Sequence, residues 1–64
     1  MADYTGEVRK ELIDNGCFFI RHGKGDHDIW YSPLTKRNVT VDNKIKSRFT
    51  ANAVMKQAGI IRKF

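Results

Sequence analysis

The residue best suited to chemistry in this sequence is His27, which lies between two carboxylates, Asp26 and Asp28. Histidine is the usual general acid or base near neutral pH, because its unperturbed pKa is about 6.5. A neighbouring carboxylate can orient the imidazole ring, and Gly25, which has no side chain, lets a phosphate approach the backbone. The pattern predicts proton transfer at a phosphate ester. An ordinary histidine at the end of a strand is the alternative interpretation.

Two groups of basic residues could assist at such a phosphate. Arg21 and Lys24 lie close to His27 in the sequence and could stabilise negative charge on phosphorus. Lys44, Lys46 and Arg48 recur at every second position before a predicted helix, and a helix N-terminus preceded by cations favours phosphate contact. The alternative for the second group is a solvated basic loop.

The charge of the chain is divided unevenly between its halves. Residues 1–32 contain four Lys/Arg against six Asp/Glu, whereas residues 33–64 contain eight against one, so −2 and +7 combine to the net charge of +5. Clustered cations of this kind favour a polyanionic partner such as nucleic acid. The alternative is that the charge only keeps a small protein in solution.

Several classes of protein are excluded or disfavoured by composition. Cys17 is the only cysteine, which excludes an internal disulfide and a zinc site built from cysteines, and it is expected to be a small buried apolar residue. The polar N-terminus contains no apolar signal-peptide segment, and the longest apolar run, Cys17–Ile20, is too short to cross a bilayer. We therefore expect a cytoplasmic protein with no membrane segment.

His22 could face His27 across a hairpin, as an acid–base pair or as two ligands of a metal ion. A metal site needs three or four ligands, and only Asp26 and Asp28 remain as further candidates. The sequence therefore predicts no metal site and no cofactor, and His22 is expected to have no catalytic role.

Residues 3–15 are predicted to form an amphipathic helix. Asp3 or Thr5 could cap its start, and Gly16 is placed to end it with a positive φ. The apolar stripe of this helix is expected to contain Val8, Leu12 and Ile13.

A second helix is predicted to start at Thr50, which would be its N-cap, and to end at Gly59. Its apolar residues follow the helical spacing i, i+3, i+4 and i+7. They are Ala51, Val54, Met55 and Ala58.

Three strands are predicted between the helices, at Cys17–His22, His27–Ser32 and Val39–Val41. A glycine-bearing loop, Gly23–Asp26, joins the first two strands, and a turn containing Pro33 joins the second and third. Short connections of this length give antiparallel neighbours, so the strands are expected to form a meander.

The 64 residues are too few for two domains, and we expect one domain spanning residues 1–64. Its fold class is α+β, with the order α-β-β-β-α and two helices covering one face of a three-stranded antiparallel sheet. This is the layout of a double-stranded-RNA-binding-domain-like fold. Trp30 and Tyr31 must lie on opposite faces of their strand, but the sequence does not say which of them is exposed.

The order of these segments resembles the HicA family of toxins, which are mRNA interferases of type II toxin–antitoxin systems. The resemblance runs from about Val8 to Ile60 and includes Gly16 and the strand through Arg21. Its most specific parts are Gly25-Asp26-His27 and Gln57-Ala58-Gly59, in that order and at this spacing within a short chain.

The resemblance implies the same fold, ribonuclease activity on mRNA and neutralisation by a HicB-type antitoxin, with the family's functional histidine at His27 and its glycine at Gly25. The chain departs from the family pattern at two places. Asp26 stands where serine is common, and Asp42 follows Val41 where proline is common, without the histidine that often comes soon after.

The leading hypothesis is a metal-independent endoribonuclease that uses His27 as acid or base. RNA contacts are expected from Arg21, Lys24, Gly25, Lys44, Lys46 and Arg48. The free protein is expected to be a monomer that forms a hetero-oligomer with its antitoxin. The main alternative is a noncatalytic RNA-binding module of the same fold. A DNA-binding repressor using residues 44–63 ranks lower, because the sequence contains no clear helix-turn-helix pair.

Overall fold

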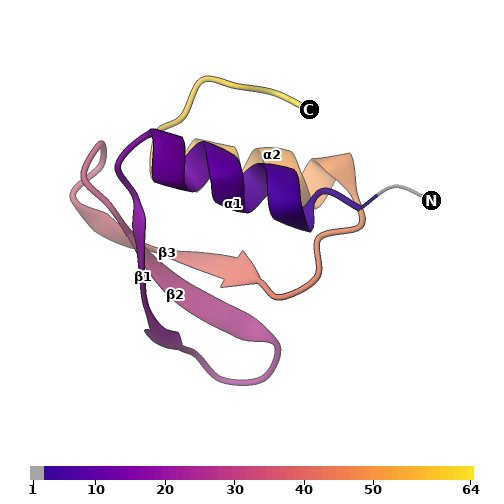
Figure 1. Ribbon diagram of the computed structural model, residues 1–64, viewed down its shortest axis with the longest axis horizontal. Coiled ribbons are helices and arrows are strands. Elements are labelled where there is room, and N and C mark those ends of the chain that lie inside the picture. The colour runs from indigo at the N-terminus through magenta and orange to yellow at the C-terminus, as the bar shows by residue number, and fades with distance from the viewer. Residues whose placement is uncertain (1–2) are drawn as a thin grey trace.

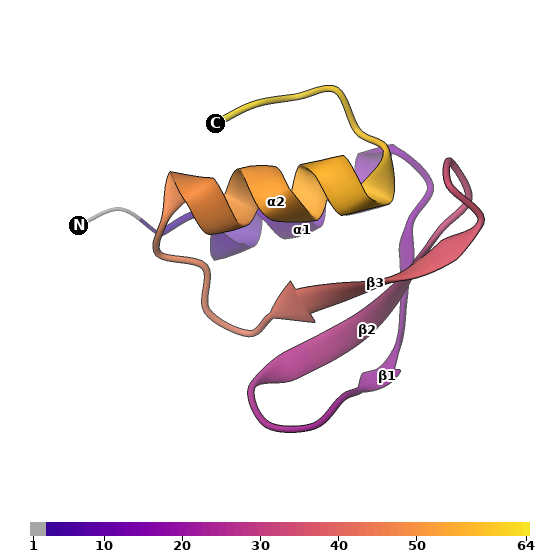
Figure 2. The same cartoon turned by 180° about the vertical axis from the view of Figure 1, so that it is seen from behind.

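The computed structural model describes residues 3–64; Met1 and Ala2, which belong to the polar N-terminus considered above, lie outside this range. Its elements follow the order α1 (Thr5–Asp14), β1 (Phe18–His22), β2 (His27–Ser32), β3 (Arg37–Asp42) and α2 (Arg48–Ala58). The strands form one antiparallel sheet in the order β1-β2-β3. Both helices cover the same face of the sheet (Figures 1 and 2). The predicted α+β fold is confirmed.

α1 packs a narrower stripe than the sequence predicted. Val8 and Leu12 are fully buried, but the prediction that Ile13 widens the stripe is wrong, because 60% of its surface is exposed. One residue turns the helix by about 100°, so Ile13 points away from the face that carries Leu12. The prediction of Asp3 or Thr5 as the cap is wrong, because the N-cap of α1 is Tyr4, which makes no side-chain cap hydrogen bond. Asp3 accepts a hydrogen bond from the Thr5 N–H (3.0 Å), and the Thr5 hydroxyl accepts one from the Ile45 N–H (2.8 Å).

The N-cap of α2 lies three residues earlier than predicted. Its N-cap is Ser47, whose backbone is extended and whose hydroxyl accepts a hydrogen bond from the Phe49 N–H at 3.1 Å. The prediction of Thr50 as the cap is wrong, because Ser47 offers the same chemistry one turn earlier and Thr50 is already helical. The helix ends as predicted at Gly59, with φ +77°. All four predicted apolar positions are buried: Ala51, Val54, Met55 and Ala58.

The core lies between the sheet and the two helices. β2 turns Asp28, Trp30 and Ser32 toward the helices, so Trp30 is the buried aromatic residue and Tyr31 lies on the open face. The Ser32 hydroxyl donates to the Ala58 carbonyl at 2.6 Å and ties the sheet to the end of α2. Cys17 is buried and free, as predicted. The other buried apolar residues of the sheet and its following segment are Val39, Val41 and Ile45.

A β-bulge in β1 decides which of its residues lie on which face. Phe19 pairs with Trp30, but the register shifts at Ile20, so that Arg21 pairs with Ile29 and His22 with Asp28. An extra residue in one strand reverses the alternation beyond it. Arg21 is thereby placed on the open face, and His22 on the face that carries the helices.

No helix within residues 3–64 is both long enough and apolar enough to cross a membrane.

Candidate active site around His27

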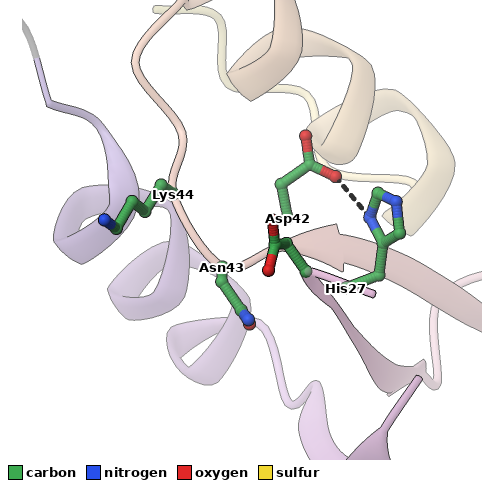
Figure 3. A pocket seen from close by; sticks show the side chains of 5 residues that line it. His27, Asp42, Asn43 and Lys44 are labelled. Carbon is green, nitrogen blue, oxygen red and sulfur yellow. Dashed lines mark ion pairs between the residues drawn. The ribbon is translucent and has the colours of Figure 1, made fainter. Parts of the chain in front are cut away.

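His27 opens β2 on the open face of the sheet. Its ring nitrogen Nδ1 lies 2.7 Å from Oδ1 of Asp42, the last residue of β3 and the backbone partner of His27 in the sheet. About half of the histidine side chain and 38% of the aspartate side chain are exposed. The second ring nitrogen, Nε2, points away from the carboxylate (Figure 3). This arrangement leaves one nitrogen of an oriented imidazole available to a ligand.

A surface depression of about 470 Å³ surrounds this pair, and its lining combines two carboxylates with one cation. The side chain of Lys44 extends away from the His27 ring, whereas Asp42 points toward it (Figure 3). The charges nearest the histidine are therefore mainly negative. The lining residues are Asp26, His27, Asp42, Asn43 and Lys44.

Among the cations predicted to contact RNA, Arg21 is the one that the sheet places on the same face as His27 and near to it. It pairs with Ile29, two residues from His27 on the same face, so the two side chains are diagonal neighbours across the strands. Diagonal neighbours are about 7–8 Å apart, which is within reach of an arginine side chain. The Arg21 guanidinium now donates to the carbonyl of His22 at 3.4 Å. It is exposed and can turn toward a ligand at His27.

The β1–β2 loop leaves the approach to His27 open. Gly25 has φ +65°, a left-handed conformation that favours glycine, and a Cβ there would meet nothing within 4 Å. Lys24 is exposed in the same loop. Both residues are therefore exposed in the loop that leads into Asp26 and His27.

The cations of residues 44–48 lie at the end of the molecule where both helices begin (Figure 1). Ile45 is fully buried and its carbonyl accepts a hydrogen bond from the Tyr4 N–H (2.7 Å), so Lys44 and Lys46 turn outward on either side of it. Hydrogen bonds from Thr5 hold the pKa of Asp3 below its usual value, with a smaller contribution from the charges of Lys46 and Lys44.

Arg48 is the first residue of α2 and its guanidinium lies over the ring of Phe49, 5.6 Å from the centroid. Neither Lys46 nor Arg48 lines the depression at His27. Of the three cations in this group, only Lys44 lines the depression.

A second cluster lies behind His27, on the face covered by the helices. Asp28 is 3% exposed and binds His22 Nδ1 (2.8 Å) and the Arg9 guanidinium (3.3 Å). With its nitrogen turned toward the carboxylate, the Asn43 amide donates to both Asp28 oxygens, at 3.0 and 3.1 Å. His22 thus lies on the opposite face from His27, and the two histidines do not form a pair.

The sequence did not predict two features of the site, the contact between His27 and Asp42 and the partners of Asp28. Asp42 is the only acidic residue among residues 33–64, which made it conspicuous, but nothing in the sequence pairs it with His27. The partners of Asp28 depend on the bulge and on the packing of α1. Within residues 3–64, no three or more His, Cys, Asp or Glu side chains are grouped closely enough to hold a metal ion.

Fold and site together define a class: a double-stranded-RNA-binding-domain-like protein with an oriented, exposed histidine at the start of its middle strand. The family model described as the HicA toxin of bacterial toxin–antitoxin systems matches residues 6–60. The chain therefore belongs to the HicA toxin family, and the matched range includes both Gly25–His27 and Gln57–Gly59. Searches of curated proteins and of solved structures found no match.

Proposed function

We propose that this toxin is an endoribonuclease that cleaves mRNA, with His27 as its proton-transfer residue. The observation that carries the proposal is the geometry of His27: the side chain is half exposed, one ring nitrogen is held by Asp42, and the other points away from that carboxylate. General acid–base catalysis requires an accessible and oriented group of this kind.

The reaction uses the 2′-hydroxyl of the RNA as the nucleophile. His27 Nε2 takes the proton of this hydroxyl, the oxygen attacks the adjacent phosphorus, and the bond to the 5′-oxygen breaks. The leaving oxygen then receives a proton, from the protonated imidazole or from water. The products are a 2′,3′-cyclic phosphate and a 5′-hydroxyl, and no metal ion takes part in the scheme. His27 acting first as an acid toward the 5′-oxygen is the other possible order.

Cations are needed because the attacked phosphate gains negative charge in the transition state. Arg21 is the best placed of them, since it shares the open face with His27. Lys44 lines the depression, and Lys24 and Gly25 lie in the exposed loop just before Asp26, which also lines it. Lys46 and Arg48 lie farther along the chain and would bind neighbouring phosphates, which extends the RNA path toward the start of α2.

A HicB-type antitoxin is the proposed partner. An acidic antitoxin would be attracted by the exposed cations Lys44, Lys46 and Arg48 at the end of the molecule where both helices begin. Charge complementarity accelerates such an encounter. We expect the bound antitoxin to cover His27. Purified complex saturated with antitoxin should then leave RNA intact, and cleavage by that complex would contradict this placement of the partner.

The decisive experiment compares wild type with His27→Ala, using His22→Ala as the matched control. His27→Ala should abolish growth arrest and slow RNA cleavage by roughly 100- to 10,000-fold, the usual contribution of an acid–base group. His22→Ala should retain activity, because His22 lies on the other face. Chelators should not change the rate.

Three outcomes would contradict the proposal. Full activity of His27→Ala would remove its catalytic residue, and loss of activity on chelation would contradict the metal-independent scheme. Salt-dependent RNA binding by wild type without any product would instead favour a noncatalytic RNA-binding module.

A further inference from the structure

We propose that Asp42 is the positioning residue of this site: its carboxylate fixes the tautomer of His27 in which Nε2 carries the free lone pair. The inference rests on the proposed function and deepens it, because it assigns His27 the role of general base. Its basis is the 2.7 Å contact between Asp42 Oδ1 and His27 Nδ1.

The sheet builds this contact into the backbone. His27 and Asp42 are cross-strand partners, and the flanking hydrogen bond from the Asn43 N–H to the Asp26 carbonyl measures 2.7 Å. A bond between the residues that flank a pair marks it as a non-hydrogen-bonded pair of an antiparallel ladder. Side chains approach each other most closely at such positions. The two side chains therefore meet because of the register.

The other face of the sheet holds the same two strand ends in place. Asp28 directly follows His27, and Asn43 directly follows Asp42. The Asn43 amide donates to the buried Asp28 carboxylate, which also accepts from Arg9. On the β1 side, the Gly23 N–H donates to the His27 carbonyl at 2.8 Å. The backbone of both members of the pair is thus fixed from two directions.

The chemistry of the pair determines which nitrogen is free. An ionised carboxylate only accepts hydrogen bonds, so a neutral His27 must carry its proton on Nδ1 and leave the lone pair on Nε2. When Nε2 takes the proton of the 2′-hydroxyl, the resulting imidazolium lies against the negative charge of Asp42. The carboxylate thereby orients the ring and stabilises the positive charge that develops on it, without itself exchanging a proton.

The same negative charge opposes the binding of RNA. Asp42 and Asp26 both line the depression, so a phosphate there is repelled by two carboxylates. Removal of the Asp42 charge should therefore reduce kcat while leaving KM unchanged or lower. A residue that only maintained the fold would not separate the two constants in this direction.

The kinetic experiment compares Asp42→Asn and Asp42→Ala with wild type on single-stranded RNA. We expect kcat to fall by roughly 10- to 100-fold, as expected for a misaligned catalytic group, with no rise in KM. Asp42→Glu, which restores a carboxylate on a longer side chain, should recover part of kcat. Asp14→Asn makes the same charge change at an exposed residue at the end of α1 and should leave both constants unchanged.

A second measurement does not depend on activity. The ¹⁵N chemical shifts of the imidazole ring distinguish the Nδ1–H tautomer from the Nε2–H tautomer. Neutral His27 should be the Nδ1–H form in wild type and shift toward the Nε2–H form in Asp42→Ala. His22 is an internal control, because its Nδ1 contacts Asp28 and not Asp42.

These measurements separate the failure of this proposal from the failure of the proposed function. If wild type does not cleave RNA, the ribonuclease proposal fails, while the ring shifts still test the link between Asp42 and the tautomer. If His27→Ala is inactive but Asp42→Ala, which removes the acceptor altogether, keeps its kcat, or if the tautomer of His27 does not respond to Asp42→Ala, the positioning role of Asp42 is overturned.

Discussion

His27 and Asp28 are adjacent residues with opposite environments. His27 is half exposed on the open face, whereas Asp28 is buried against Arg9, His22 and Asn43. A strand places consecutive side chains on opposite faces, so one residue can serve chemistry while the next serves stability. At this scale the site is a histidine supplied by β2 and a carboxylate supplied by β3, backed by a separate buried cluster.

Replacing Asp28 should reduce stability. In Asp28→Asn, one neutral oxygen has to satisfy donors that a carboxylate now serves, so we expect the free energy of unfolding to fall by about 1–3 kcal/mol. Urea denaturation followed by circular dichroism measures the change. Asp26→Asn, the same substitution at an exposed neighbour, should stay within about 0.5 kcal/mol of wild type. Equal losses in the two variants would mean that the buried cluster contributes nothing specific.

The sequence singled out His27 as a candidate but could not predict the residue that contacts it. Asp42 lies fifteen positions away, and the pairing follows from the register of a hairpin that a single-residue slip would change. The sequence also could not predict on which face of the sheet Arg21 and His22 lie, because this depends on the bulge at Ile20. The chemistry of a residue can be predicted from its type, but its neighbours are known only once the strand pairing is known.

At the scale of elements, the sequence predicted the interiors of helices and strands more accurately than their ends. The spacing of the buried residues of α2 predicted its face, because apolar burial determines the orientation of a helix. Its start was misplaced, because Ser47 and Thr50 have similar capping chemistry and only the path of the preceding segment distinguishes them. In α1, Ile13 was assigned to the core because apolar character alone does not show where the stripe ends.

The cap of α2 gives a direct test of where the helix begins. Ser47→Ala removes the acceptor of the Phe49 N–H and should cost about 1 kcal/mol of stability, within the range of about 0.5–2 kcal/mol for such caps. Thr50→Ala, inside the helix, should cost less, because alanine is the better helix former. Thermal denaturation of both variants measures the difference. The opposite ranking would return the cap to Thr50.

Glycine at position 59 joins α2 to the β2–β3 turn. Gly59 has φ +77°, and a Cβ there would lie 2.9 Å from Thr35 Cγ2 and 3.3 Å from Leu34 Cβ. Gly59→Ala should therefore destabilise the protein by more than about 1 kcal/mol, from backbone strain and this close approach.

Gly6 provides the matched control for this substitution. It lies in α1, and a Cβ there would meet nothing within 4 Å. Gly6→Ala should stabilise the protein, by up to about 1 kcal/mol, because alanine favours the helix. Denaturation midpoints of the two variants should move in opposite directions, and a shift of the same sign in both would refute the argument.

At the scale of the whole molecule, ion pairs join the acidic first half of the sequence to the basic second half. Arg62 from the basic half binds Glu11 (2.8 Å) and Glu7 (3.5 Å) on α1, and Lys44 and Lys46 lie close enough to Asp3 to affect its pKa. Exposed pairs of this kind stabilise the fold little, typically by less than about 1 kcal/mol. Their main effect is that part of the positive charge is neutralised at the helices.

The remaining cations should determine how RNA binding responds to salt. In a His27→Ala background, which removes the proposed proton-transfer residue, Lys46→Ala and Arg48→Ala should each weaken RNA binding and reduce the slope of log K against log salt by roughly one contact. Lys56→Ala removes an equal charge near the other end of α2 and should change the slope less. Titrations by fluorescence anisotropy at several salt concentrations measure all three. Equal slopes for the three variants would mean that RNA binding depends only on the net charge of the protein.

The buried Asp28 has one more consequence, which concerns the fidelity of strand pairing. Because side chains alternate, a slip of β2 by one residue would bury the imidazole of His27 and expose Asp28, leaving Arg9 and Asn43 without their acceptor. Such a misaligned chain would lose its buried hydrogen bonds and would no longer expose the histidine proposed for catalysis. The buried carboxylate next to the histidine therefore raises the free energy of this misaligned form relative to the native fold. The form that is disfavoured is the one in which the toxin would be inactive.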